Sequence, residues 1–253
     1  MGPVAVVTGG SSGIGAALAR KLAARGWHCV LLARREERLR ELAAEVKGEY
    51  EVCDVSDRTA VERVAATVTA RHPAIKLLVN NAGIPGRGSF FDAEPERIEQ
   101  VIRVNYLGGV WCLRAFLPAL ERAARSDVVN VVSVAGAVAA GTSGPYTASK
   151  HAQLAFSRVT AAQLRKRGVR VHTVLPGFTE SEGFPQRGVL PGWVGRLVIE
   201  PEEVAEQIVR AVERDRGESF VPRWYRLAAL VQALAPGLLA RAAASGKVPQ
   251  NRA

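Results

Sequence analysis

The chain has 253 residues, of which 48% are hydrophobic and 23% are charged. This composition permits a large buried core and excludes a disordered, collagen-like or coiled-coil chain. Lysine and arginine outnumber aspartate and glutamate by 34 to 24, a net charge of +10, but the basic residues are spread along the chain and only 6% of residues are aromatic. We therefore expect an arginine-rich solvated surface and no nucleic-acid partner.

The cysteines, the histidines and the first residues bear on metal binding and on the cellular compartment. Cys29, Cys53 and Cys112 cannot all pair, and none lies in a CxxC motif or in a Cys/His cluster with zinc-ligand spacing. The four histidines are scattered, which predicts structural roles and no metal site. The first residues carry no secretory signal, and no stretch of about 18 apolar residues could span a membrane. These features favour a reducing, cytoplasmic location.

Short runs rich in β-branched residues alternate with longer amphipathic segments along the chain. The runs predicted as strands are Val4–Val7, Cys29–Leu32, Glu51–Cys53, Leu77–Val79, Val128–Val132, Arg170–Val174 and Ser219–Val221. Because these runs are continuously apolar, they indicate a parallel sheet covered on both faces. The sequence therefore predicts one α/β domain over residues 1–253, with a core over 1–222. Its architecture is a doubly wound, Rossmann-type parallel sheet of about seven strands with helices on both faces.

A glycine-rich turn follows the first strand and precedes a helix expected over Ala16–Arg25. The turn reads Thr8-Gly9-Gly10-Ser11-Ser12-Gly13-Ile14-Gly15. Glycines let a phosphate approach backbone N–H groups at a helix N-terminus. The strand before and the helix after this turn favour a nucleotide cradle, with contacts from Gly9, Ser11, Ser12, Gly13 and Ile14.

Two arginines end the second strand, some twenty residues after the glycines, where a dinucleotide fold places its ribose-binding residue. An aspartate there would bind the 2′-hydroxyl of NAD, whereas the guanidinium groups of Arg34 and Arg35 suit the 2′-phosphate of NADP. The alternative is that both arginines begin an exposed helix rich in charges. Asp54-Val55, at the end of the next strand, could receive the adenine amino group, or Asp54 could cap a helix.

A third set of polar residues follows later strands. Asn80-Asn81-Ala82-Gly83 comes after the fourth strand, Asn105 lies in the next helix and Ser133 ends the fifth strand. Tyr146 and Lys150 are four residues apart, so they lie on one face of a helix that begins after Pro145. We expect the nearby ammonium to lower the pKa of Tyr146 and to make the phenol a usable general acid and base.

The ordered set of glycine turn, Asn-Asn-Ala-Gly, Ser133, Tyr146 and Lys150 resembles the classical short-chain dehydrogenase/reductase family, from about residue 4 to 222. The resemblance implies that Tyr146 exchanges a proton with the substrate oxygen and that Ser133 hydrogen-bonds the same oxygen. Lys150 would also bind the nicotinamide ribose, and Asn105 would hold the relay water that connects Lys150 to solvent. A hydride would come from the nicotinamide.

The resemblance also implies cofactor contacts outside the glycine turn. Asn81, Ala82 and Gly83 would line the cofactor, and Pro176-Gly177 would begin the loop that fixes the carboxamide. Thr179 and Ser181 stand where the family commonly has Val and Thr. Members that prefer NADP often carry a basic residue where this chain has Ser12, so the expected preference for NADP(H) over NAD(H) depends on Arg34 and Arg35.

The segment 182–200 stands where this family has its substrate lid. Its apolar residues are Phe184, Leu190, Trp193, Val194 and Leu197, between prolines and glycines. An apolar flap predicts a hydrophobic substrate, in contact with Ser133, Tyr146, Phe184 and Trp193. The alternative is that these side chains pack against the C-terminal residues.

The C-terminal residues depart from the family's usual ending, a strand followed by an Asp-Gly-Gly turn. Ser219–Val221 is followed by Pro222-Arg223-Trp224-Tyr225-Arg226 and by an apolar segment, Leu227–Arg241, that is broken at Pro236-Gly237. This predicts an atypical hydrophobic helical extension over 223–253. The extension could lie on a membrane surface, cover the substrate cleft or pack on another subunit.

Together these features predict an NADP(H)-dependent oxidoreductase that interconverts a ketone or aldehyde and an alcohol on a hydrophobic small molecule. The alternatives are an NAD(H)-dependent alcohol or steroid dehydrogenase, a 3-oxoacyl-carrier reductase and a catalytically silent nucleotide-binding regulatory protein. The family resemblance implies a homodimer or homotetramer, formed through the helices that follow Asn105 and Tyr146.

Overall fold

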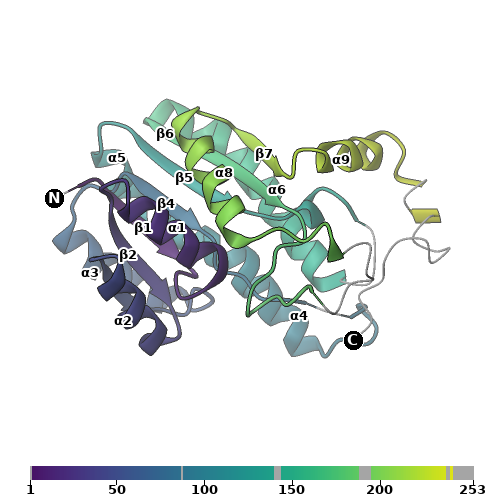
Figure 1. The fold of residues 1–253 in the computed structure, drawn as a ribbon, viewed down its shortest axis with the longest axis horizontal. Helices are drawn as coiled ribbons and strands as arrows, with labels where there is room; N and C mark the ends of the chain where they lie inside the picture. The colour runs from purple at the N-terminus through teal and green to yellow at the C-terminus, as the bar shows by residue number, and fades with distance from the viewer. Residues whose placement is uncertain (1, 87, 140–143, 188–194, 238–239, 242–253) are drawn as a thin grey trace.

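The computed structural model describes residues 2–86, 88–139, 144–187, 195–237 and 240–241. Within them, seven strands form one parallel sheet in the order β3-β2-β1-β4-β5-β6-β7 (Figure 1). They are β1 (Val4–Thr8), β2 (His28–Ala33), β3 (Glu49–Val52), β4 (Leu77–Asn80), β5 (Ser126–Val131), β6 (Val169–Pro176) and β7 (Glu218–Val221). The predicted doubly wound sheet is confirmed.

Helices cover both faces of this sheet. α1 (Gly13–Ala23), α2 (Glu36–Glu45) and α8 (Pro201–Glu213) pack on one face, and α3 (Arg58–Arg71), α5 (Gly108–Arg122) and α6 (Gly144–Leu164) pack on the other. α4 (Pro95–Ile102) leads into α5 through a π-helical turn, Arg103–Leu107. α9 (Tyr225–Leu234) follows β7 and extends beyond the edge of the sheet, at the right of Figure 1.

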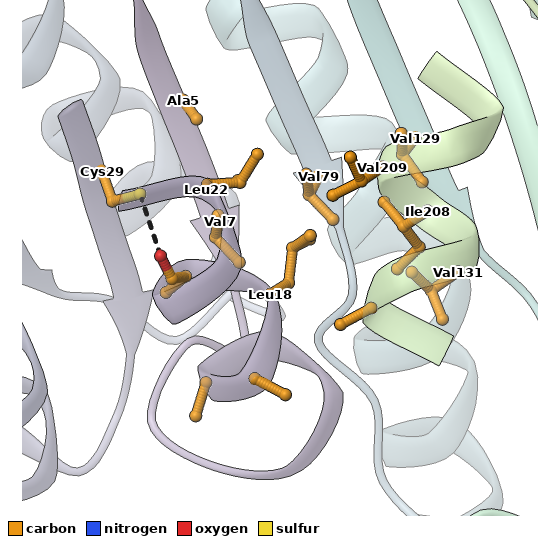
Figure 2. Packing of buried hydrophobic residues seen from close by; sticks show 14 of the residues in the cluster. Ala5, Val7, Leu18, Leu22, Cys29, Val79, Val129, Val131, Ile208 and Val209 are labelled. Atoms are coloured by element: carbon orange, nitrogen blue, oxygen red, sulfur yellow. Dashed lines mark hydrogen bonds between the residues drawn. The ribbon is translucent and has the colours of Figure 1, made fainter. Parts of the chain in front are cut away.

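The central strands are apolar on both sides because both sides are covered. All five residues of β1 are buried. Figure 2 shows Val7 of β1 and Val79 of β4 facing Leu18 of α1 and Ile208 of α8. Cys29 belongs to the same buried cluster, where its thiol donates to the carbonyl oxygen of Ala19 at 3.7 Å. These layers fix α1 and α8 on the sheet and therefore fix the loops at the carboxyl ends of the strands.

The ends of several elements differ from the sequence prediction. β3 begins at Glu49, two residues earlier than expected, because this edge strand pairs only with β2 and alternates polar with apolar residues. The first helix spans Gly13–Ala23 instead of Ala16–Arg25, since the glycine turn leads directly into the helix. The last apolar helix begins at Tyr225 and ends at Leu234, before Pro236.

The strand order reverses between β1 and β4. The chain moves from β1 outward to β2 and β3, then crosses back to β4 on the other side of β1. Loops that follow β1 and β4 therefore diverge and leave a crevice at the carboxyl ends of these strands, where ligands bind in open α/β sheets.

Candidate active site

A pocket of about 820 Å³ lies at this end of the sheet. The residues predicted to bind cofactor all line it, together with Ser133 and Phe184. Asn105 lies behind the pocket wall and is 1% exposed. Trp193, like Leu190 and Val194, lies outside the described residues. The structure thus brings together segments that are up to about two hundred residues apart in the sequence.

The glycine turn is held in shape by β4 and the loop after it. The hydroxyl of Thr8 accepts hydrogen bonds from the backbone N–H groups of Asn81 (2.9 Å) and Ala82 (3.1 Å). The Asn81 side chain donates to the carbonyl oxygen of Thr8 at 3.0 Å. Gly13 has φ +52°, and a Cβ atom there would lie 3.1 Å from Cβ of Ser181. A side chain at Gly13 would therefore fill the cradle, and the cradle as it stands fits a dinucleotide.

Both arginines after β2 line the pocket, although they are exposed. The Arg35 guanidinium donates to Ser12 Oγ at 2.6 Å and to Ser11 Oγ at 3.2 Å. It also contacts the Glu182 carboxylate at 3.3 Å. Arg34 lies 3.8 Å from Asp54. The guanidinium of Arg35 therefore stands between the glycine turn and the start of the segment 182–200.

Asp54 closes a turn instead of capping a helix. Its carboxylate accepts hydrogen bonds from the backbone N–H of Ser56 at 2.9 Å and from the Ser56 hydroxyl at 2.7 Å. The N-cap of α3 is Asp57, which accepts from the N–H groups of Thr59 and Ala60. Asp54 still lines the pocket.

Tyr146 and Lys150 lie on the first turns of α6, as their spacing predicts. The Lys150 side chain is buried, and Nζ lies 5.7 Å from the centroid of the Tyr146 ring. Nζ donates to Gln153 Oε1 at 2.8 Å and to the carbonyl oxygen of Val131 at 3.2 Å. Ser133 follows β5 and lines the same pocket.

The electrostatics of this pair differ from the sequence prediction. Burial raises the pKa of Tyr146 to about 12, and the hydrogen bond with Ser133 opposes that rise. Burial also lowers the pKa of Lys150 to about 7. The expected lowering of the Tyr146 pKa by the ammonium is therefore wrong for this structure. Desolvation weakens the charged form of both groups, and the ammonium is held by Gln153 and Val131.

Asn105 joins the π-helical turn to α6. Its Oδ1 accepts from the backbone N–H of Ile84 at 2.8 Å, and its Nδ2 donates to Ser149 Oγ at 3.0 Å. Ser149 in turn donates to the carbonyl oxygen of Tyr146 at 2.7 Å. Asn105 therefore positions the turn of α6 that carries Tyr146 and Lys150.

Sequence analysis missed Gln153, Ser149 and the pocket residues of the C-terminal extension. Gln153 is 2% exposed and lies one helical turn after Lys150. A polar residue at this spacing on a buried helix face was the available signal. Trp224, Tyr225 and Ala228 line the pocket, so the first turn of α9 covers the cleft. No local sequence signal distinguished a helix that covers the cleft from one that lies on a membrane surface or packs on another subunit.

Tyr225 packs on the loop after β6. Its side chain is buried, and a Cβ atom at Gly177 would lie 2.1 Å from its Cε2. The Trp224 ring stacks on the Tyr225 ring with centroids 3.8 Å apart. On another wall, the Phe184 ring lies 5.8 Å from the Tyr146 ring. Aromatic side chains from two distant segments thus border the space in front of Tyr146.

Two histidines that the sequence suggested were isolated share one carboxylate. Nε2 of His28 and Nε2 of His72 each lie 2.9 Å from Oε1 of Glu49. Arg71 binds the other oxygen of Glu49 at 2.9 Å. These groups lie at the amino ends of β2 and β3, opposite the pocket. Their hydrogen bonds satisfy one another and join β2, β3 and α3.

Comparison with known proteins identifies the family. The family model for short chain dehydrogenases matches residues 3–187. The chain belongs to the short-chain dehydrogenase/reductase family. It is an NAD(P)-dependent oxidoreductase that acts on CH–OH groups and interconverts carbonyl and alcohol groups.

Relatives and solved structures agree with this assignment. The granaticin polyketide synthase putative ketoacyl reductase 1 of Streptomyces violaceoruber is 34% identical over 221 residues, which cover 85% of this chain and 80% of that protein. A structure of actinorhodin polyketide ketoreductase with NADPH superposes with a TM-score of 0.78 at 27% identity, covering 87% of this chain and 95% of that one. A metagenomic short-chain oxidoreductase in complex with NADP has 36% identity, a TM-score of 0.70 and coverages of 82% and 88%. In the part of this short-chain dehydrogenase that the structure describes, no helix is both long and apolar enough to cross a membrane.

Proposed function

We propose that this short-chain dehydrogenase is an NADP(H)-dependent enzyme that interconverts a ketone or aldehyde and an alcohol on a hydrophobic small molecule. The observation that carries this proposal is one pocket that holds Ser133, Tyr146 and Lys150 in front of the glycine turn and is bordered by aromatic side chains.

The glycine turn, Arg34, Arg35, Asp54, the loop 81–83 and the loop after β6 would hold the cofactor. When bound, the nicotinamide supplies or accepts the hydride. Tyr146 gives its phenolic proton to the substrate oxygen in reduction and takes it back in oxidation. The Ser133 hydroxyl donates a hydrogen bond to the same oxygen. When the Lys150 amine is protonated, its positive charge stabilises the phenolate of Tyr146. Asn105 positions Tyr146 and Lys150 through Ser149.

The preference for NADP(H) is supported by the surroundings of Ser12. Many NADP-preferring members of the family carry a basic side chain at this position, and here Arg35 places its guanidinium 2.6 Å from Ser12 Oγ. Two serine hydroxyls and two guanidinium groups form a donor-rich site for a 2′-phosphate. A site that prefers NAD would carry a carboxylate at the end of β2, where this chain has Arg34.

The substrate side is apolar. Phe184, Leu197 and Trp224 line the pocket with the aromatic face of Tyr225. We infer that the segment 182–200, of which Phe184 and Leu197 line the pocket, is the substrate lid; Trp193, predicted to contact substrate, lies outside the described residues. The apolar side chains of this segment and of α9 that line the pocket favour an apolar carbonyl compound.

A 3-oxoacyl group on a carrier protein is the second candidate. The observation that favours it is the similarity to a protein described as a putative ketoacyl reductase, together with a net charge of +10 that suits an acidic carrier.

We further infer a cytoplasmic homodimer or homotetramer formed through α5 and α6.

The first test is a titration of the purified protein with NADPH and, separately, NADH, followed by energy transfer from protein to nicotinamide fluorescence. We expect NADPH to bind at least about tenfold more tightly, a difference of about 1.4 kcal/mol. Arg34→Gln/Arg35→Gln should weaken NADPH binding and leave NADH binding unchanged. Arg40→Gln, on the exposed side of α2, is the control. Equal or NADH-favouring binding would overturn the cofactor preference, and no binding of either would overturn the enzymatic role.

The second test is Tyr146→Phe, which removes only the phenolic oxygen. Turnover of a carbonyl substrate should fall by about 10²-fold or more, because the proton transfer is lost, while NADPH binding is retained. Tyr106→Phe is the matched control, since Tyr106 packs edge-on against Phe156 away from the pocket. Near-normal turnover in Tyr146→Phe would refute the acid–base assignment.

A further inference from the structure

The helix α9 has two distinct faces. Tyr225, Ala228 and Gln232 lie on one side at helical spacing: the first two line the pocket, and the Gln232 side chain accepts a hydrogen bond from the backbone N–H of Ala139 at 3.1 Å. At about 100° per residue, the opposite side consists of Leu227, Leu230, Val231 and Leu234. We call these four residues the outer stripe. Their exposed fractions range from 41% for Val231 to 76% for Leu234.

The outer stripe is the main apolar feature of the described surface. Nine large hydrophobic side chains are exposed there, and four of them form the stripe. A fifth, Trp224, directly precedes α9. Single exposed hydrophobic side chains are common on proteins, but a continuous stripe on one helix marks a contact surface. The outer stripe is therefore a candidate contact surface.

The charges around the stripe discriminate between partners. Arg223 and Arg226 are exposed at the start of α9 and have no ion pair with any described residue. After Glu218 the sequence contains five cationic residues and no aspartate or glutamate: Arg223, Arg226, Arg241, Lys247 and Arg252. A two-fold contact between two α9 helices would bring like charges together with no carboxylate on this segment to neutralise them. An anionic lipid surface offers both hydrocarbon and negative charge.

We propose that α9 is an interfacial helix that binds the surface of an anionic phospholipid bilayer. The outer stripe inserts at the level of the first acyl carbons, and Arg223 and Arg226 contact lipid phosphates. Because the inner face of the same helix lines the pocket, binding places the pocket beside the lipid. An apolar substrate dissolved in the bilayer then has a short path to Tyr146, a step that rests on the proposed function.

The test is sedimentation of the full-length protein with sucrose-loaded vesicles. One set of vesicles contains phosphatidylcholine alone, and the other contains phosphatidylcholine with about 30% of the anionic lipid phosphatidylglycerol. We expect binding to the anionic vesicles that weakens with added salt. Leu230→Gln/Leu234→Gln and Arg223→Gln/Arg226→Gln should each lower the partition coefficient by about tenfold or more. The matched controls are Val52→Gln, an exposed aliphatic residue of β3, and Arg40→Gln/Arg63→Gln on α2 and α3.

The outcomes separate this proposal from the enzymatic one. Absence of binding to anionic vesicles at low salt would overturn it, as would equal binding of wild type and the stripe variant. If the protein does not bind vesicles and the stripe variant has a different mass by light scattering, the outer stripe is a contact between two copies of the chain. NADPH titration of the same samples reports on the pocket independently, so failure of membrane binding leaves the cofactor result intact.

Discussion

Lys150 is held by a neutral side chain in a dry part of the pocket. Gln153 supplies the shortest hydrogen bond to its Nζ, and no carboxylate contacts this nitrogen among the described residues. Because burial lowers the pKa of Lys150 to about 7, the ammonium loses its proton in a range where an exposed lysine stays charged. Burial alone causes this shift, and the neutral Gln153 does not oppose it, so we expect a charge at residue 153 to control the charge available beside Tyr146.

Gln153→Glu tests this control in the cofactor-free protein. The Lys150 pKa is lower in the folded than in the unfolded state, so burial of this charged group lowers the free energy of unfolding. This loss is at its maximum below pH 7 and diminishes as the pH rises towards 10.5. A carboxylate at 153 raises the Lys150 pKa and reduces the cost at pH 7, by about 1.4 kcal/mol per pKa unit. The melting temperature of the variant minus that of wild type should therefore fall between pH 7 and pH 10.

The control for this experiment is Gln163→Glu, an exposed position on the same helix. It should give a difference that is flat with pH. Parallel curves for Gln153→Glu and Gln163→Glu would show that Gln153 does not govern the charge of Lys150.

At the residue scale, sequence reasoning identified the groups whose spacing along the chain defines the chemistry, such as Tyr146 with Lys150. It did not identify Gln153, Ser149 or Tyr225, because their roles depend on which atoms lie within hydrogen-bond or van der Waals distance after folding. The direction of the Tyr146 pKa shift was wrong for the same reason. Spacing shows that an ammonium is near, but desolvation is a property of the packed pocket.

At the element scale, the contact between the end of β6 and the start of α9 determines how closely α9 lies over the pocket. Gly177→Ala would place a Cβ atom 2.1 Å from Cε2 of Tyr225, so α9 or the loop must move. We expect a loss of about 1–3 kcal/mol in the free energy of unfolding, measured with urea. The loss should be smaller in a Tyr225→Ala background, where the ring is absent.

Gly217→Ala is the matched control for this prediction. No atom lies within 4 Å of the Cβ position at Gly217, so its cost should stay within about 0.5 kcal/mol. Equal costs of Gly177→Ala in the wild-type and Tyr225→Ala backgrounds would show that the two residues do not press on one another.

Central strands were predictable where their hydrophobic pattern is consistent, as in β1 and β2. The edge strand β3 and the central strand β5 were both placed two residues late, because each begins with polar residues. The position of α9 was not predictable, since an apolar helix carries no information about which of its faces packs on the protein. Its first turn covers the cleft, and its outer stripe does not.

At the scale of the whole molecule, a buried charge network secures the end of the sheet opposite the pocket. Asp127 of β5 accepts from Arg170 at 2.6 Å and contacts His172 Nε2 at 2.7 Å, both on β6. Nδ1 of His172 contacts the carbonyl oxygen of Arg216, just before β7. The carboxylate of Asp127 therefore links β5 to β6, and His172 continues the link to the residues before β7, far from the pocket.

This network predicts how the protein responds to acid. Burial favours protonation of Asp127, but the hydrogen bonds from His172 and Arg170 outweigh it and hold the pKa of Asp127 below its usual value. Its contribution is therefore present above about pH 4 and is lost as the pH falls through the folded pKa. Asp127→Asn should cost about 3 kcal/mol at pH 7, because the mostly buried Arg170 loses its short ion pair and keeps only the longer contact with the half-exposed Asp215. The variant should also lose less stability than wild type between pH 5 and pH 3.

Chemical denaturation at pH 7, 5 and 3 measures both effects. Asp215→Asn is the control, since Asp215 also faces Arg170, at 3.6 Å, but is 43% exposed. It should change stability by about 1 kcal/mol or less. An equally steep acid response in Asp127→Asn would place the acid-sensitive group elsewhere.

The contact between Arg35 and Glu182 has a consequence for cofactor entry. In the structure, Glu182 contacts Arg35 at 3.3 Å and Arg38 at 3.1 Å, so an internal carboxylate occupies the guanidinium group of Arg35, which lies beside Ser11 and Ser12. Under the proposed preference for NADP(H), a 2′-phosphate entering this site would displace that carboxylate, one anion replacing another beside Arg35. A dinucleotide without the phosphate would leave the exchange undone. We therefore expect the two dinucleotides to leave residue 182 differently tethered, so that the identity of the cofactor is transmitted to the segment in front of Tyr146 before any substrate arrives.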